Sequence, residues 1–210
     1  MGKVNHKHQL TPESSLKRGL FMSKKYGVLT EVAITAALSM TLSLVPDFFS
    51  WFTPSLGALP LIIFALRRGM KYGLLAGLIW GLLHFLMAKV YYLTFSQVFI
   101  EYILAFSSMG LAGLSHRSIQ KALRQNQRFT AVIWAIGGAF TATAVRYFFH
   151  YLAGFIFWGS YAPKGISPYW YSFTVNASAG LATFLLVAIV LVFLIPSQAH
   201  FFLLDKKAAS

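Results

Sequence analysis

The feature that most constrains this chain is a series of apolar segments separated by short, mostly basic stretches. Six such segments are recognisable: about Tyr26–Val45, Leu56–Leu66, Tyr72–Tyr91, Gln97–Leu114, Thr130–Trp158 and Pro168–Ile195. A transmembrane helix needs about 20 predominantly apolar residues. Because the bilayer core offers no water to backbone groups, segments that cross it fold as helices. We therefore predict an all-α membrane protein, a bundle of six transmembrane helices.

The second segment departs from this pattern. Leu56–Leu66 is too short to cross a hydrocarbon core of about 30 Å unless flanking residues join it. Pro54 and Pro60 lie near its start, so one helix of the bundle is expected to be short or irregular. The composition agrees with a membrane protein, since 57% of the 210 residues are apolar and only 11% are charged. An ordinary soluble domain carries about 25% charged residues.

The net charge of +13 is explained by membrane topology. In a six-span arrangement, 15 of the 18 Lys and Arg residues lie on one side, and the exceptions are Lys89, Arg146 and Lys164. Cytoplasmic loops carry an excess of Lys and Arg, so both termini are predicted to be cytoplasmic. The positive charge then serves orientation and attraction to anionic lipid headgroups, and nucleic-acid binding is not expected.

Three regions are predicted along the chain. Residues 1–25 are polar and basic and lack the apolar core of a secretory signal, so we expect a disordered cytoplasmic extension. Residues 26–197 form the six-helix membrane domain, and residues 198–210 form a cytoplasmic tail.

Several catalytic classes find no support in the sequence. The chain contains no Cys, which excludes disulfides and thiolate chemistry. The sequence lacks the motifs G-x-x-x-x-G-K-[ST], H-E-x-x-H and G-x-S-x-G, and it offers no recognisable means of hydrolysing ATP. We expect a protein that is not an enzyme, with no metal and no cofactor.

Polar and aromatic residues gather instead in the outer half of the predicted bundle. An acid inside a membrane is costly and marks a functional site by default. A carboxylate among aromatic rings suits a flat cationic ligand, and His and Asn side chains can recognise ring nitrogens and amino groups. The predicted binding residues are Trp51, Tyr91, Glu101, Tyr102, His150, Trp158, Tyr171 and Asn176.

Each polar candidate also has a structural interpretation. Glu101 could serve as the ion-pair partner of Arg146. His150 could be a satisfied buried histidine, and Asn176 could tie two helices together. His84 lies in the third segment, where we favour a packing role.

Four stretches carry a resemblance to a known family. They are SLGALPLIIFALRRGMKYGLLAGLIWGLLHF (Ser55–Phe85), VFIEYILAF (Val98–Phe106), YFFHYLAGFIFWGSYAPKG (Tyr147–Gly165) and SPYWYSFTVNASA (Ser167–Ala179). Over about residues 27–197 the chain resembles the thiamine-specific substrate-binding subunits, or S components, of energy-coupling factor (ECF) transporters. The resemblance implies a six-helix fold that captures thiamine with high affinity from outside the cell.

The resemblance also implies roles for the eight predicted binding residues. Glu101 would balance the thiazolium charge, and Trp158 would stack on one ring of the ligand. His150, Tyr171 and Asn176 would recognise the aminopyrimidine edge. Two further roles concern Trp51, which would form part of a lid, and Arg146, which would form a supporting ion pair that keeps Glu101 ionised.

S components pair with a transmembrane coupling subunit and two ATPase subunits. The family docks through an A-x-x-x-A face of its first helix, which Ala33 and Ala37 match. The glycine ridge Gly73, Gly77 and Gly81 is interpreted as a packing surface. Two alternatives stay open at this point: an S component for another vitamin or a thiamine precursor, and an intramembrane enzyme that uses Glu101 and His150 as acid–base groups.

Overall fold

A computed structural model describes residues 12–45 and 54–204, with side chains from Gly27 onward. All regular secondary structure in these ranges is helical. The elements are α1 (Pro12–Leu42), α2 (Ala58–Arg68), α3 (Met70–Leu86), α4 (Phe95–Val98), η1 (Phe99–Leu104), α5 (Ala105–Ser108), η2 (Met109–Ser115), α6 (His116–Arg124), α7 (Arg128–Phe157), η3 (Gly159–Tyr161), α8 (Pro168–Ser197) and α9 (Ala199–Phe202).

Three continuous helical stretches are long and apolar enough to cross a membrane. They are Phe95–Arg124, Arg128–Phe157 and Pro168–Ser197, each of 30 residues. Gly27–Leu42 and Met70–Leu86 are shorter apolar helices, and α2 has only 11 residues. The predicted class, an all-α membrane protein, is confirmed. The first of the long stretches joins α4, η1, α5, η2 and α6 end to end.

Two helices extend beyond their predicted bounds. α1 begins at Pro12 rather than near Tyr26, so part of the segment predicted as a disordered extension is helical. A proline is accepted in the first turn of a helix, and no second proline interrupts the residues that follow. The helix that was predicted to end near Leu114 continues through α6, so Arg117 and Lys121 lie on a helix and not in a loop.

Two predicted helix ends also differ. α3 ends at Leu86, so Tyr91 belongs to the connection that follows and not to the helix itself. This connection turns at Ala88, whose φ of 52° is left-handed. α8 continues past its predicted end at Ile195, includes Pro196 and ends at Ser197. A proline has no N–H and therefore removes one backbone hydrogen bond. Because Pro196 lies in the last turn of α8, the loss of this bond does not break the helix.

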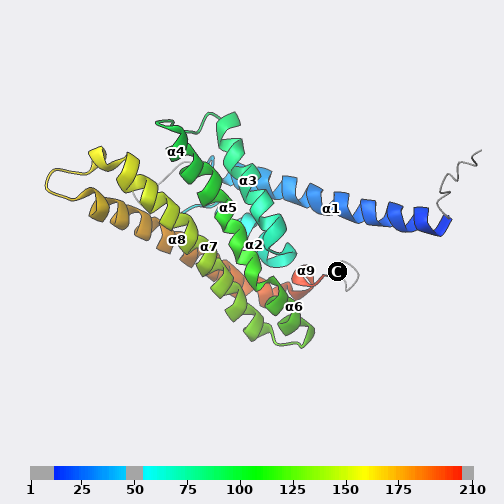
Figure 1. Ribbon diagram of the computed structural model, residues 1–210. Coiled ribbons are helices and arrows are strands. Elements are labelled where there is room, and N and C mark those ends of the chain that lie inside the picture. Colours follow the sequence, from blue (N-terminus) through cyan, green and yellow to red (C-terminus); the bar gives the residue numbers. More distant parts are fainter. Residues whose placement is uncertain (1–11, 46–53, 205–210) are drawn as a thin grey trace, which may run out of the picture.

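The helices form a bundle with one long hairpin. α7 and α8 run side by side as an antiparallel pair, and the N-terminal part of α1 projects away from the other helices (Figure 1). α2 and α3 are joined through Gly69 alone, which adopts φ 90°. Only glycine takes this backbone conformation without a steric penalty, so the two helices can reverse direction within one residue.

Glycines bring α3 into backbone contact with the stretch from η1 to η2. A methyl group added at Gly77 would clash with the carbonyl oxygen of Phe106, and one at Gly81 would clash with that of Tyr102. From the other side, Gly110 lies against the backbone of Leu74. Small residues permit this close packing of helices in a membrane. The predicted glycine ridge therefore does pack one helix against another.

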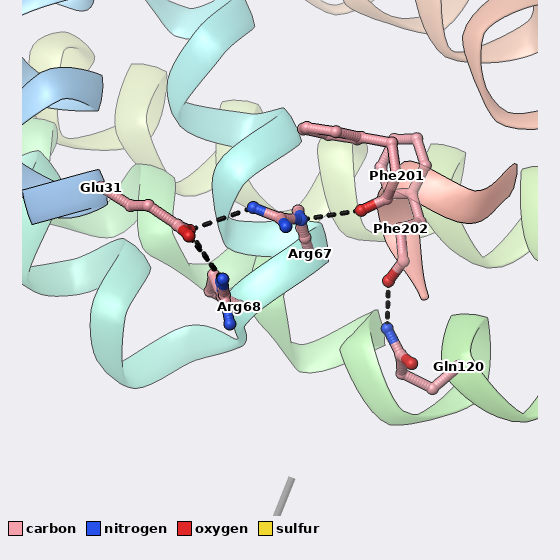
Figure 2. A network of polar contacts seen from close by, with 6 residues as sticks. All are labelled: Glu31, Arg67, Arg68, Gln120, Phe201 and Phe202. Atoms are coloured by element: carbon pink, nitrogen blue, oxygen red, sulfur yellow. Dashed lines mark hydrogen bonds and ion pairs between the residues drawn. The ribbon is translucent and has the colours of Figure 1, made fainter. Parts of the chain in front are cut away.

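An ion-pair network joins α1 to α2 (Figure 2). It lies at the same end of the bundle as α6 and the start of α7, which carry Arg117, Arg124 and Arg128. Glu31 Oε2 accepts from Arg67 Nη1 at 3.0 Å and from Arg68 Nε at 2.7 Å, and Glu31 Oε1 accepts from Arg68 Nη2 at 2.5 Å. The same Arg67 donates through Nε to the carbonyl oxygen of Phe201 at 2.7 Å. We call this region the basic end.

The C-terminal part of the described chain is held at the basic end by side-chain bonds to its backbone. Gln120 donates to the carbonyl oxygen of Phe202 (Figure 2) and accepts from the backbone N–H of Leu204 at 3.1 Å. Arg124 donates to the carbonyl oxygen of Leu204 at 2.5 Å. Arg128 likewise donates to that of Pro196 at 2.9 Å. Four helices are thereby tied together at this end.

The glycine contact predicts a sharp difference between two Gly→Ala substitutions. Gly77→Ala should lower the stability of the fold by about 2 kcal/mol, because the added methyl forces two helices apart. This corresponds to a fall in Tm of about 4–8 °C for a chain of this size. Gly137→Ala is the matched control, since its methyl group would meet no atom within 4 Å. Thermal unfolding of both variants in one detergent measures the difference, and equal Tm values would contradict the packing role.

Candidate ligand-binding site

Two cavities lie at the end of the bundle opposite the basic end. They share Glu101, His150 and Trp158 in their walls and have volumes of about 280 Å³ and about 370 Å³. The remaining predicted binding residues divide between them. Tyr171 and Asn176 line the first cavity, and Tyr91 and Tyr102 line the second. Seven of the eight predicted residues thus meet, and the eighth, Trp51, lies outside the described residues.

Glu101 stands at the wall common to both cavities. It belongs to η1, a wide π-type turn in which the N–H of Ala105 bonds to the carbonyl oxygen of Ile100. Such turns inside helices occur frequently at functional sites. Each carboxylate oxygen of Glu101 accepts a hydrogen bond: Oε1 from Trp158 Nε1 at 2.8 Å, and Oε2 from Gln97 Nε2. Both donors are neutral.

Gln97 organises one side of the site, and the sequence prediction missed it. Its side chain is fully buried. Besides its bond to Glu101, Nε2 donates to the carbonyl oxygen of Tyr91 at 3.1 Å, and Oε1 accepts from the N–H of Leu93 at 3.2 Å. One amide therefore fixes both the carboxylate and the connection that carries Tyr91. The available signal was its spacing, because Gln97 precedes Glu101 by one helical turn.

Aromatic rings surround the carboxylate. The ring of Tyr91 meets the ring of Trp158 edge to face, with 6.2 Å between the ring centres. The backbone N–H of Tyr91 donates to Tyr102 Oη at 3.2 Å. The ring of Tyr102 stacks on Phe106 at 5.9 Å and lies 5.8 Å from His84. His84 is buried with Nδ1 donating to the carbonyl oxygen of Trp80 at 2.9 Å, and it also lines the second cavity, so its predicted packing role stays a prediction.

The predicted ion pair between Arg146 and Glu101 is not formed among the described residues. Arg146 packs its guanidinium against aromatic faces, 4.5 Å from the ring centre of Phe106 and 4.7 Å from that of Trp80. Its Nε donates to Nε2 of His150 at 3.4 Å. Sequence reasoning paired the two charges because both lie inside apolar segments. The rings of Phe106 and Trp80 give the guanidinium another favourable environment.

The first cavity is completed by α8. Asn176 donates to the carbonyl oxygen of Ser172 at 2.9 Å and to its Oγ at 3.3 Å, so the amide is oriented by its own helix. Ser172 in turn donates to the carbonyl oxygen of Tyr151 on α7 at 2.9 Å. This bond holds the two helices together at the depth of the cavity. Ser172, Tyr161 and Gly154 line the cavity and were absent from the prediction.

A further hollow lies between α7 and α8 and has a different character. Its volume is about 390 Å³, and its walls are almost wholly apolar, including Phe140, Phe148 and Phe184. Phe140 and Phe148 are exposed, whereas Phe184 is partly buried against the core. A hollow of this kind on a membrane protein suits lipid chains. It offers no carboxylate or imidazole, so the two cavities around Glu101 are the better candidates for a specific site.

The predicted docking residues lie on the outer face of α1. Ala33 and Ala37 are exposed, and the neighbouring Ile34 and Leu38 expose 54% and 51% of their surface. The opposite face of the helix, which includes Ala36, is buried against the bundle. The exposed face is therefore a stripe of small and apolar side chains.

Comparison with known proteins decides the family. The model of the family described as "Thiamine transporter protein" matches residues 29–203. The chain belongs to the thiamine transporter protein family. Two relatives carry the name "Thiamine transporter ThiT". That of Lacticaseibacillus paracasei is 35% identical and covers 89% of this chain and 96% of its own, and that of Bacillus subtilis is 30% identical and covers 88% and 98%.

A solved structure agrees with these relatives. The structure of ThiT from Listeria monocytogenes superposes with a TM-score of 0.81 at 41% identity, covering 86% of this chain and all of that one. The resemblance found in the sequence is confirmed at the level of the family and the fold. The names of the relatives also confirm the prediction of a transport protein rather than an enzyme.

Gln97 generates a prediction for the site. Gln97→Met keeps the volume of the side chain but leaves Glu101, Tyr91 and Leu93 without a shared partner. Leaving these part-buried polar groups unpaired should cost about 1–3 kcal/mol, so Tm should fall by several degrees. Hydrogen exchange of backbone amides in residues 89–93 should also accelerate. Gln125→Met, in the exposed turn after α6, is the control, and equal exchange in both variants would contradict the role of Gln97.

Proposed function

We propose that this chain binds thiamine in the two cavities around Glu101 and is the substrate-binding subunit of a vitamin B1 uptake system in the cell membrane. One observation carries the proposal. Glu101 has a neutral N–H donor on each carboxylate oxygen, and no Lys, Arg or His forms an ion pair with it in the described part of the chain. Lys89 lines the second cavity but forms no ion pair with Glu101. A carboxylate that no described cation pairs with is complementary to a ligand that supplies a positive charge.

The surroundings favour an aromatic cation over a metal ion or an ammonium group. Trp158, Tyr91 and Tyr102 present ring faces and edges around the carboxylate, and cation–π attraction contributes roughly 0.5–2 kcal/mol for each well-placed ring. The described residues contain no cluster of three or more metal-ligating side chains. Thiamine joins a cationic thiazolium ring to a neutral aminopyrimidine, which matches a site with an acid, aromatic rings and hydrogen-bonding groups.

The names of the relatives support the same ligand. The two curated relatives and the solved structure each carry the name ThiT, and the curated ones are called thiamine transporters. A neutral vitamin would leave the half-buried Glu101 carboxylate without a cationic partner, which is expensive. An intramembrane enzyme would require an activated nucleophile beside Glu101 and His150. The hydroxyl of Ser172, which lines the first cavity, donates to the carbonyl oxygen of Tyr151 and not to either of these groups.

The remaining parts of the proposal concern orientation and partners. The basic end faces the cytoplasm, both termini are inside, and the cavities open toward the exterior, in accordance with the positive-inside rule. The chain has no nucleotide-hydrolysis motif. Transport therefore uses an ECF-type transmembrane coupling subunit and two ATPase subunits, and the exposed stripe around Ala33 and Ala37 docks the coupling subunit.

The positive charge of the ligand should contribute to binding affinity only when Glu101 keeps its negative charge. Glu101→Gln should weaken thiamine binding roughly a hundredfold, because removal of one partner from a buried charge pair costs about 2–5 kcal/mol. A neutral analogue, in which carbon replaces the thiazolium nitrogen, should bind the unmodified protein weakly and lose little more in Glu101→Gln. Equilibrium binding by tryptophan fluorescence measures all four combinations.

Two outcomes of this binding experiment contradict the proposal in different ways. Equal loss for thiamine and the neutral analogue would show that Glu101 does not recognise charge. Tight thiamine binding that survives both Glu101→Gln and Trp158→Ala would place the ligand elsewhere. A panel that includes riboflavin and the isolated aminopyrimidine separates thiamine from other vitamins and precursors.

The docking surface yields a separate prediction. Ala37→Trp should leave thiamine binding unchanged, because Ala37 faces away from the cavities, but should abolish uptake by cells that contain the coupling and ATPase subunits. Thr41→Trp, one turn further along the same exposed face, tests how far the surface extends, and Phe193→Trp on α8 is the control for a bulky ring on an exposed face. Normal uptake by Ala37→Trp would contradict docking through α1.

A further inference from the structure

Arg146 is a buried cation without a carboxylate partner among the described residues. It is only 6% exposed, and its guanidinium lies against the rings of Trp80, Phe106 and Tyr147. Its Nη1 is buried and has no hydrogen-bond partner in the described part of the chain. The proposed ligand site does not use this side chain directly, because Arg146 lines neither of the two cavities.

The polar contact of Arg146 that bears on the site is with His150, one turn later on α7. Arg146 Nε approaches His150 Nε2 at 3.4 Å. A guanidinium has N–H donors and no acceptor, so the nitrogen that faces it must present a lone pair. A proton on Nε2 would place an N–H group against an N–H group of a fixed cation. Of the two neutral tautomers of His150, the contact therefore selects the one protonated at Nδ1.

We propose that Arg146 is a positioning residue that holds His150 as the Nδ1–H tautomer, so that the imidazole acts as a hydrogen-bond donor at the wall of both cavities. The nitrogen opposite Arg146 is the one left to face a ligand. No described side chain bonds to His150 Nδ1, whereas Nε2 is occupied by Arg146. This inference rests on the proposed function only for the identity of the ligand.

The consequence is a polarised site. Glu101 contributes a carboxylate at the wall common to the cavities, while His150, with the cation of Arg146 behind it, contributes an N–H donor. A ligand with a positive charge at one end and an acceptor nitrogen in an aromatic ring at the other fits this arrangement in one orientation. The opposite tautomer would offer a lone pair and would favour an amino group at the same place.

His84 provides an internal comparison. Its Nδ1 lies 2.9 Å from the carbonyl oxygen of Trp80, and a carbonyl can only accept, so His84 is also protonated at Nδ1. Its tautomer is fixed by its own helix and not by Arg146. Any change that affects His150 and leaves His84 unaltered therefore reports the Arg146 contact and not a general loosening of the bundle.

The tautomer can be observed without any ligand. The full-length protein is labelled with ¹⁵N-histidine and reconstituted in detergent micelles, and the His150 signals are assigned from their loss in His150→Gln. The protein should show His150 protonated at Nδ1. Arg146→Gln, which retains an N–H donor without charge, should preserve this state, and Arg146→Leu should give a mixture of tautomers. The signals of His84 should remain constant.

A binding measurement tests the consequence. Arg146→Leu should weaken thiamine binding roughly tenfold, the effect of one lost hydrogen bond, and Arg146→Gln should restore most of it. Of two thiamine analogues that each lack one pyrimidine nitrogen, the one without the accepting nitrogen should be insensitive to Arg146→Leu. Equal sensitivity of both analogues and thiamine would mean that Arg146 acts only on the general shape of the site.

The tautomer of His150 and the identity of the ligand are tested separately by these experiments. A proton on Nε2 of His150 in the unsubstituted protein would overturn the role of Arg146, even if thiamine binds tightly. So would an unchanged Nδ1–H tautomer in Arg146→Leu. If the spectra agree with the proposal but thiamine does not bind, the proposed ligand is wrong and the tautomer assignment stands.

Discussion

The close backbone contact between α3 and the stretch η1–η2 is the constraint on which the rest of the structure depends. Gly77 and Gly81 allow the carbonyl oxygens of Phe106 and Tyr102 to approach the α3 backbone, and Gly110 does the same in the opposite direction. In lipid, helices gain little from the hydrophobic effect and associate through such close packing. The contact fixes the depth and rotation of η1, and hence the place of the Glu101 carboxylate.

The binding region and the basic end are held by different kinds of interaction. Around Glu101, the neutral side chains of Gln97 and Trp158 position the carboxylate, and no Lys or Arg forms an ion pair with it in the described part of the chain. At the basic end, Glu31 is fully engaged by Arg67 and Arg68, and side chains such as Gln120 bond to the backbone of the C-terminal segment. Glu31 thus has two cationic partners at the basic end, whereas Glu101 has only neutral donors at the place where a cationic ligand is expected.

The sequence could point to residues that share two cavities because these residues are unusual where they occur. An acid, an imidazole and an amide inside apolar segments stand out against their surroundings, and seven of the eight predicted residues line the two cavities. Gln97 was missed because a glutamine near a helix start has many ordinary explanations. The Arg146–Glu101 pair was wrong because the sequence gives no distance between helices, and the aromatic faces that surround Arg146 come from two other helices and its own.

By itself the sequence determined the membrane class, the helical architecture, the clustering of basic residues on one side and the residue types of the site. These properties follow from local hydrophobicity and charge, which each segment carries independently of the others. Only the tertiary structure decided which donors hold Glu101, where the buried cation lies and which nitrogen of His150 faces it. Those features depend on the rotation and depth of neighbouring helices. For Arg146, they decide that the guanidinium contacts the rings of Phe106 and Trp80 and does not pair with Glu101.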